Sequence, residues 1–372
     1  MTATVAQFVS ILDHLAPPHL AESWDNVGLQ IGNRDWPVKK VWTALDPLPA
    51  VVARACENDV DLLVTHHPLF FKPVKRIDCN SPLGGIAEMA LSRRLAIYSA
   101  HTNLDSVPGG VNDVLVGRIG LHKVRVLAGP ADVDMCKLVV FVPSNRAETI
   151  LDTLFAMDAG RMGNYSCCSF RCEGVGTFLP GAGSSPAVGK TGTLAEVQES
   201  RIEILVANTD LSAVVRALKK VHPYESMAYD AYPLTVRDHQ AGLGRVGELE
   251  SPMPLVAFAA KLKAELSLST VKIVGKADRV VETVAVCSGS GASLMTAAIA
   301  TGAQAYVSGD LGYHTARDAQ QAGIGLIDIG HFGSEHLVVD VLAALIRESV
   351  KASGLSATVE AVDTEEDPFR YL

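Results

Sequence analysis

The chain has 372 residues, of which 48% are hydrophobic, and a formal net charge of −9. This length exceeds the usual size of a single hydrophobic core, so we expect two domains or one domain with a large insertion. The acidic balance, with no Lys/Arg run longer than a dipeptide, argues against the concentrated basic face of a nucleic-acid-binding protein. The apolar stretches are short and interrupted by charge, which argues against a membrane span.

Two further features concern the cellular compartment. The seven cysteines are scattered and form no Cys-x-x-Cys pair, a pattern typical of reduced thiols. Residues 1–15 carry no basic segment and have the pattern of an amphipathic helix, not of a signal peptide. We therefore expect a cytoplasmic protein.

Helices and strands alternate at both ends of the chain. In the N-terminal part, we expect helices at residues 3–15, 49–58, 83–94 and 110–119, and strands at 41–45, 62–65 and 96–100. In the C-terminal part, we expect helices at residues 254–266, 292–301, 315–322 and 333–353, and strands at 280–287, 305–308 and 325–329. This alternation is typical of an α/β sheet.

The middle of the chain has a different pattern. Its expected elements are strands at 137–142, 174–179, 201–206 and 228–234, and helices at 146–159 and 211–221. Their β-α-β-β-α-β order resembles the ferredoxin-like plan. We predict a mixed-sheet α/β domain formed by residues 1–130 and 241–372, interrupted by a ferredoxin-like α+β insertion at residues 131–240.

Two adjacent histidines, His66 and His67, end the apolar run at residues 60–65 and are followed by Pro68. Neighbouring side chains of a strand point to opposite faces, so the two imidazoles can converge only where the strand ends. Pro68 marks that end. Imidazole is the commonest metal ligand, so the pair suggests a metal site. Two ordinary loop histidines are an equally good explanation of this stretch alone.

Two more strand ends carry possible ligands. Asp105 follows the strand at residues 96–100, although it could simply cap the next loop. His331 and Glu335 follow the strand at 325–329 and share one face of a helix that starts there. Ligands gather at the carboxyl ends of strands in open α/β sheets.

Together the three strand ends supply three histidines and two carboxylates. Such a set suits two divalent cations ~3.5–4 Å apart that share a bridging carboxylate. Zinc, iron or manganese fits these donors better than calcium does.

Three other polar residues are weaker candidates. Asp310 and His314 also follow a strand, and His101 precedes Asp105. Each could orient a ligand or move protons in catalysis, or could have a purely structural role.

Two glycine-rich segments raise the question of phosphate binding. Residues 183–191 end in Gly-Lys-Thr, but five residues instead of four separate the glycines, so the P-loop interpretation is rejected. Residues 288–291 open a helix, where backbone N–H groups could hold an anion. A tight strand-to-helix turn explains residues 288–291 equally well.

Four motifs carry a resemblance to a known family. They are Trp-Asp-Asn-Val-Gly-Leu-Gln at 24–30, Thr-His-His-Pro-Leu at 65–69, His-Thr-Asn-Leu-Asp at 101–105 and Gly-His-Phe-Gly-Ser-Glu at 330–335. They resemble the signatures of the NGG-interacting-factor-like family, whose bacterial members are often labelled GTP cyclohydrolase 1 type 2 homologs. Residues 176–178, 199–203 and 222–225 are similar to the PII/CutA-like insertion of its longer members. Ser226 stands where a second acid is common.

The resemblance implies an α/β fold with a dinuclear metal centre, assembled as a ring-shaped homohexamer. Carried over by motif, the ligands would be His66, His67, Asp105, His331 and Glu335, with Glu335 as the bridge. It also implies a small-molecule substrate, GTP, whose purine ring would be opened with loss of formate.

Three functions are compatible with these expectations. The first is a metal-dependent hydrolase, in which His314, His101 or Asp310 would assist the metal centre. The second is a metal-binding adaptor or regulatory ring without catalysis. The third is a dinuclear phosphoesterase. Loss of turnover in Glu335→Ala with intact assembly would separate an enzyme from an adaptor.

Overall fold

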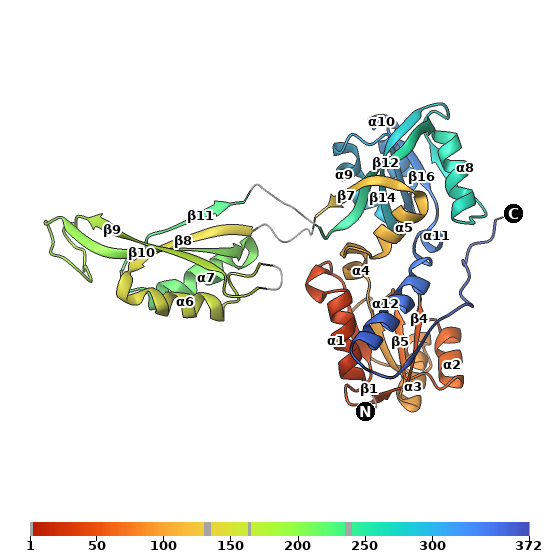
Figure 1. The fold of residues 1–372 in the computed structure, drawn as a ribbon, viewed down its shortest axis with the longest axis horizontal. Helices are drawn as coiled ribbons and strands as arrows, with labels where there is room; N and C mark the ends of the chain where they lie inside the picture. The colour runs from red at the N-terminus through yellow and green to blue at the C-terminus, as the bar shows by residue number, and fades with distance from the viewer. Residues whose placement is uncertain (1–2, 130–134, 163–164, 235–239, 372) are drawn as a thin grey trace. The chain divides into compact units, whose positions relative to one another are not determined.

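The computed structural model describes residues 3–129, 135–162, 165–234 and 240–371. It divides into two compact units, one formed by residues 1–130 with 239–372 and the other by 131–238 (Figure 1). Each unit is described by itself. None of the described helices combines the length and the apolar character needed to span a lipid bilayer.

The first unit contains two mixed sheets. The first sheet has the order β17-β4-β5-β6-β2. Its strands are β2 (Gly28–Ile31), β4 (Lys40–Ala44), β5 (Leu62–Thr65), β6 (Ala96–Ser99) and β17 (Thr358–Ala361). All pairings are parallel except that of β2 with β6. Every residue of β5 and β6 is buried, as expected for central strands covered on both faces.

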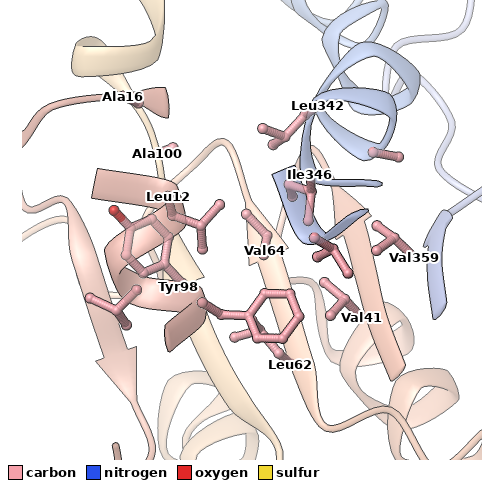
Figure 2. Packing of buried hydrophobic residues seen from close by; sticks show 14 of the residues in the cluster. Leu12, Ala16, Val41, Leu62, Val64, Tyr98, Ala100, Leu342, Ile346 and Val359 are labelled. Atoms are coloured by element: carbon pink, nitrogen blue, oxygen red, sulfur yellow. The ribbon is translucent and has the colours of Figure 1, made fainter. Parts of the chain in front are cut away.

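Helices cover both faces of this sheet. They are α1 (Val5–Leu15), α2 (Pro49–Glu57), α3 (Pro82–Arg93) and α12 (Val338–Ala352). Figure 2 shows one face, where Leu12 of α1 and Ile346 of α12 belong to the same core cluster as Val64 and Tyr98. The alternate strand residues pack against α2 and α3 on the other face. The two-residue strands β1 (Ala3–Thr4) and β3 (Pro37–Val38) pair beside this core.

The second sheet has the order β13-β16-β15-β14-β12-β7. Its strands are β7 (Leu121–Ala128), β12 (Leu243–Pro254), β13 (Lys272–Val274), β14 (Val280–Ser290), β15 (Ala305–Gly309) and β16 (Gly325–Asp328). Strands β14, β15 and β16 are parallel, and the others pair antiparallel. Helices α5 (Val111–Ile119) and α8 (Leu255–Glu265) pack on one face, and α9 (Met295–Ala300) and α10 (Tyr313–Ala322) on the other.

Each end of the chain contributes a strand to the sheet built mainly by the other. Strand β17, from the C-terminal part, pairs with β4, and β7, from the N-terminal part, pairs with β12. The prediction of a mixed α/β domain built from both chain ends is therefore confirmed, with two sheets instead of one.

The second unit is a four-stranded antiparallel sheet with two helices. Its elements are β8 (Met135–Pro143), α6 (Ala147–Ala156), β9 (Ser169–Phe178), β10 (Ala195–Ala207), α7 (Asn208–Val221) and β11 (Tyr229–Pro233). The sheet order is β11-β8-β10-β9, and α6 and α7 pack on it with their own apolar core. The order of elements is the predicted one. A relation to PII/CutA-type domains stays a prediction.

The helix predicted at 333–353 is wrong in one respect, because the structure has two helices there. Helix α11 (His331–Glu335) is followed by α12, which begins at Val338. The short helix contacts β14 and β15 of the second sheet, whereas α12 packs on β4 of the first. The break between α11 and α12 therefore allows this segment to pack on both sheets.

Arg245 on β12 tests the packing of the first unit. The residue is 2% exposed. It donates to both carboxylate oxygens of Asp113 at 2.6 and 3.0 Å, and to the carbonyls of Gly242, Gly244 and Val107. We expect Arg245→Met to lower the free energy of unfolding by about 3–5 kcal/mol, because it leaves these acceptors unpaired. Urea denaturation followed by circular dichroism measures the change.

Lys123→Met is the matched control. Lys123 forms an ion pair with Glu248, which lies on β12 like Arg245, but the Lys123 side chain is exposed. An exposed pair contributes little, so its unfolding midpoint should match that of the wild type. Equal midpoints for the two variants would contradict a structural role of Arg245.

Candidate metal centre

The predicted ligands lie together in the first unit, where the carboxyl ends of strands from its two sheets meet. His66 and His67 follow β5 directly, and Asp105 lies in the short helix α4 (Thr102–Ser106) after β6. His331 and Glu335 are the first and last residues of α11, after β16. The structure brings all five together.

His66 and His67 converge because the chain turns after β5 and each ring is held through Nδ1. His66 Nδ1 is 2.9 Å from the carbonyl oxygen of Ala100, and His67 Nδ1 is 2.8 Å from Asp46 Oδ1. A carbonyl only accepts, so Nδ1 of His66 carries a proton and its Nε2 is left for another partner. The two ring centroids are 5.1 Å apart.

Glu335 lies at the centre of the cluster and is 3% exposed. Its Oε2 is 3.0 Å from His67 Nε2 and 2.9 Å from His331 Nε2. Its Oε1 is 3.7 Å from His66 Nε2. One carboxylate therefore faces ligands from both sheets.

Three groups of donor atoms have the spacing of a metal site, with all atoms of a group within 4.8 Å of one another. They are His66, Asp105 and Glu335; His67, His331 and Glu335; and His66, His67 and His101. Glu335 belongs to the first two groups, as a bridging ligand would.

A buried atom of His66 tests whether the site fits a cation. Its Nε2 is buried and has no hydrogen-bond partner among the described residues. It lies 3.8 Å from Asp105 Oδ1 and 3.7 Å from Glu335 Oε1, which is too far for a hydrogen bond. A buried polar atom normally has a partner. A divalent cation between these three donors would supply it, so the residues fit a metal.

The charges of the cluster also favour a bound cation. Burial lowers the pKa of His67, but Asp46 and Glu335 outweigh it and raise that pKa to about 10. The hydrogen bond with Glu335 raises the pKa of His331 to about 9. Burial raises the pKa of Glu335, but the surrounding histidines hold it well below its usual range. An environment that stabilises protons on these rings stabilises a metal ion in their place.

Carboxylates orient the other imidazoles, as is usual around metal ligands. Asp310 Oδ2 is 2.7 Å from His331 Nδ1, so Asp310, a sequence candidate, positions a ligand. Asp25 Oδ1 is 2.9 Å from His101 Nδ1. Asp25 and Asp46 were missed as site residues. Asp25 lies in the Trp-Asp-Asn motif, and Asp46 follows β4 at the same sheet edge, which could have identified both.

The remaining two candidates have different surroundings. The His101 ring centroid is 5.2 Å from that of His66 and 5.5 Å from that of His67, so His101 lies beside the centre. His314 is exposed on α10, and its ring contact within the described residues is with Tyr313. The structure does not bring His314 into the cluster. A role for it in proton transfer stays a prediction.

The loop at residues 288–291 supports the ligands. Ser288 Oγ donates to Asp105 Oδ1 at 3.2 Å, and Gly289 N donates to Ser334 Oγ at 2.8 Å. Gly289 has φ +59°, and a Cβ there would lie 2.1 Å from Glu335 Oε1. These contacts favour the tight-turn interpretation over the anion site, because the loop is filled by the ligands' own contacts.

Comparison with known proteins places this geometry in a family. The family model described as Duf34/NIF3 (NGG1p interacting factor 3) matches residues 3–368. A GTP cyclohydrolase 1 type 2 homolog of Bacillus subtilis (strain 168) is 37% identical over 366 residues, covering 98% of each chain. The Mycobacterium tuberculosis protein of the same name is 38% identical over 359 residues, covering 95% of this chain and 94% of its own.

Solved structures agree with this assignment. The crystal structure of a Bacillus cereus protein related to NIF3 has a TM-score of 0.71 and 37% identity, and all of both chains is covered. A Staphylococcus aureus protein has a TM-score of 0.76 and 30% identity, covering 100% of this chain and 99% of its own. The chain therefore belongs to the DUF34/NIF3 (NGG1p interacting factor 3) family.

Proposed function

We propose that the protein is a hydrolase that works with two divalent cations, for which Glu335 would be the shared ligand. The observation that carries this proposal is the position of Glu335 in two donor groups at once, beside a buried His66 Nε2 without a partner. His66 and Asp105 would complete one site, and His67 and His331 the other. The nitrogen and oxygen donors suit zinc, iron or manganese.

When bound, such a pair of cations supplies Lewis acidity and lowers the pKa of water toward neutrality. The chain's own residues supply orientation and proton handling. Asp46 and Asp310 fix the rings of His67 and His331 through their Nδ1 atoms.

His101 is the residue we propose for proton transfer. Burial raises the pKa of Asp25, but the hydrogen bond and charge of His101 and the two hydrogen bonds from Thr102 together outweigh it and lower that pKa to about 2. Asp25 is therefore ionised at neutral pH and accepts the Nδ1 proton of His101. With Nδ1 held by Asp25, His101 would use its other ring nitrogen, beside His66 and His67, to relay a proton.

The names of the relatives indicate the first substrate to test. They are called GTP cyclohydrolase 1 type 2 homologs, so we propose hydrolytic opening of the purine ring of GTP. In that reaction one water adds to a ring carbon and opens the ring to a formamide. A second water hydrolyses the formamide, so that both carbon–nitrogen bonds of that carbon are broken, the two nitrogens take up protons and the carbon leaves as formate. Assembly as a ring-shaped homohexamer is part of the proposal, and light scattering of the purified protein measures it.

Glu335→Gln tests the metal centre. Removing the charge of the shared carboxylate should reduce bound metal from about two ions per chain to one or fewer, and formate release from GTP by at least about 100-fold. Elemental analysis and a formate assay measure the two effects. Glu348→Gln, an exposed carboxylate on α12, is the matched control and should behave as wild type.

The outcomes separate the parts of this proposal. Near-zero metal in the wild type after reconstitution with zinc, iron and manganese would overturn the metal centre. Full metal content without formate release from GTP would overturn the substrate and favour the adaptor.

Gly289→Ala tests the close approach of the Gly289 backbone to the Glu335 carboxylate. The added methyl group would displace the Glu335 carboxylate, so we expect zinc affinity to fall by about 10–100-fold, as for other perturbed ligand supports. Competition with a chromophoric chelator measures it. Gly302→Ala is the control, because Gly302 also has positive φ, +76°, but open space around it. Equal affinities in the two variants would mean that the methyl group does not reach the ligand.

A further inference from the structure

An exposed pair of aromatic side chains lies beside the candidate metal centre. Trp24 is 56% exposed and Phe71 is 52% exposed, and their ring centroids are 5.6 Å apart. Both rings also approach His101, at 6.0 and 6.2 Å between centroids. A single imidazole therefore separates the aromatic pair from the ligands His66 and His67. Large aromatic side chains left exposed together mark a surface that binds something.

Hydrogen bonds hold both aromatic residues in place. Asp25, next to Trp24, accepts from the backbone N and the hydroxyl of Thr102 as well as facing His101. Asn26 Nδ2 donates to the carbonyl oxygen of Phe70 at 2.7 Å, which fixes the residue before Phe71. Hydrogen bonds of the neighbouring residues therefore hold the backbone that carries the two rings.

The segment that follows Phe71 is basic. A pocket of about 510 Å³ is lined by Asn26, Phe70 and residues 72–77. Its lining includes Lys72, Lys75 and Arg76 and no carboxylate. No ion pair or hydrogen bond of these three side chains is found within the described part of the chain. In a protein with a net charge of −9, this pocket is a locally basic surface that would attract an anion.

A second pocket, which reaches the candidate centre directly, has the opposite charge. A pocket of about 470 Å³ reaches His67 and His331 and is lined by Asp46, Asp310, Asp328 and Asp367. Its lysine, Lys272, already pairs with Asp328 at 3.0 Å. Two of these aspartates hold His67 and His331, so this pocket belongs to the candidate metal centre. Lys72, Lys75 and Arg76 have no such partner among the described residues and therefore offer a place for a phosphate group.

We propose that Trp24, Phe71, Lys72, Lys75 and Arg76 form a binding site for a nucleotide, an aromatic ring that carries a phosphate group. The ring stacks against Trp24 and Phe71, and the phosphate lies among the three cations. This orientation brings the ring to His101 and the ligands behind it. The inference rests on the proposed hydrolase, because it assigns that enzyme's substrate site.

Direct binding tests the site. Zinc-loaded full-length protein is titrated with GTP, guanosine and inorganic tripolyphosphate, by calorimetry and by tryptophan emission. Trp24 is the exposed tryptophan, since Trp42 is 7% exposed and Trp36 is half-buried. We expect GTP and guanosine to quench the tryptophan emission of the wild type. In Trp24→Ala, the affinity for GTP and for guanosine measured by calorimetry should fall by at least 10-fold. Trp24→Phe, which keeps a ring, should retain most of the affinity.

The three cations are replaced together in Lys72→Ala, Lys75→Ala, Arg76→Ala. This variant should bind GTP at least 10-fold more weakly, bind tripolyphosphate more weakly as well, and bind guanosine as the wild type does. The matched control removes three exposed lysines elsewhere on the same unit, in Lys263→Ala, Lys276→Ala, Lys351→Ala, and should bind all three probes normally.

Wild-type affinities in Trp24→Ala and in the variant at 72, 75 and 76 would overturn the site. A loss of assembly in Trp24→Ala by light scattering, with unchanged affinity per chain, would also overturn it and assign the aromatic pair to a subunit contact. Failure of the hydrolase proposal can be told apart from failure of the nucleotide site. If the three probes bind as expected but no formate is released from GTP, the site stands and the hydrolase fails. Formate release with an unchanged KM in Trp24→Ala leaves only the hydrolase.

Discussion

The buried carboxylate of Glu335 is the interaction on which the arrangement of the first unit depends. A carboxylate that is 3% exposed is costly unless charged or polar partners surround it. His66 and His67 come to it from the first sheet, and His331 comes from its own short helix beside the second sheet. Holding one carboxylate between these rings requires the strand ends of the two sheets to face each other. The candidate centre and the packing of the sheets are therefore one feature.

The support around Glu335 shows how much of the local backbone is arranged for this contact. Asp310, which holds His331, has φ +53°, a conformation that side chains other than glycine rarely adopt. Gly289 leaves the space that the Glu335 carboxylate fills. The division of the predicted long helix into α11 and α12 lets Glu335 face the second sheet while α12 packs on the first. The positive φ of Asp310, the absence of a side chain at Gly289 and the break between α11 and α12 therefore all help to position the Glu335 carboxylate.

Charge is distributed unequally around this centre. Aspartates orient His67, His101 and His331. Two of them, Asp46 and Asp310, also line an acidic pocket. The loop after β5 instead carries Lys72, Lys75 and Arg76, which have no ion pair among the described residues, and the exposed ring of Phe71. The proposed metal centre and the proposed anion site therefore occupy separate parts of one unit, although the whole chain is acidic. The net charge, which argues against nucleic acid as a partner, does not exclude a small anion at this loop.

The sequence by itself predicted the side chains that meet at the candidate metal centre and the strongly patterned elements. Strands β5, β6, β15 and β16 are short apolar runs followed by polar residues, so both the strands and the side chains at their ends were predictable. The tertiary structure decided the rest. The exchange of β7 and β17 between sheets, the support from Asp25 and Asp46, and the place of Trp24 beside His101 depend on contacts between distant residues. Periodicity reports which face of an element is buried, but not which other element covers it. For the same reason, the sequence did not reveal that His314, which lies on α10 after β15, is outside the cluster.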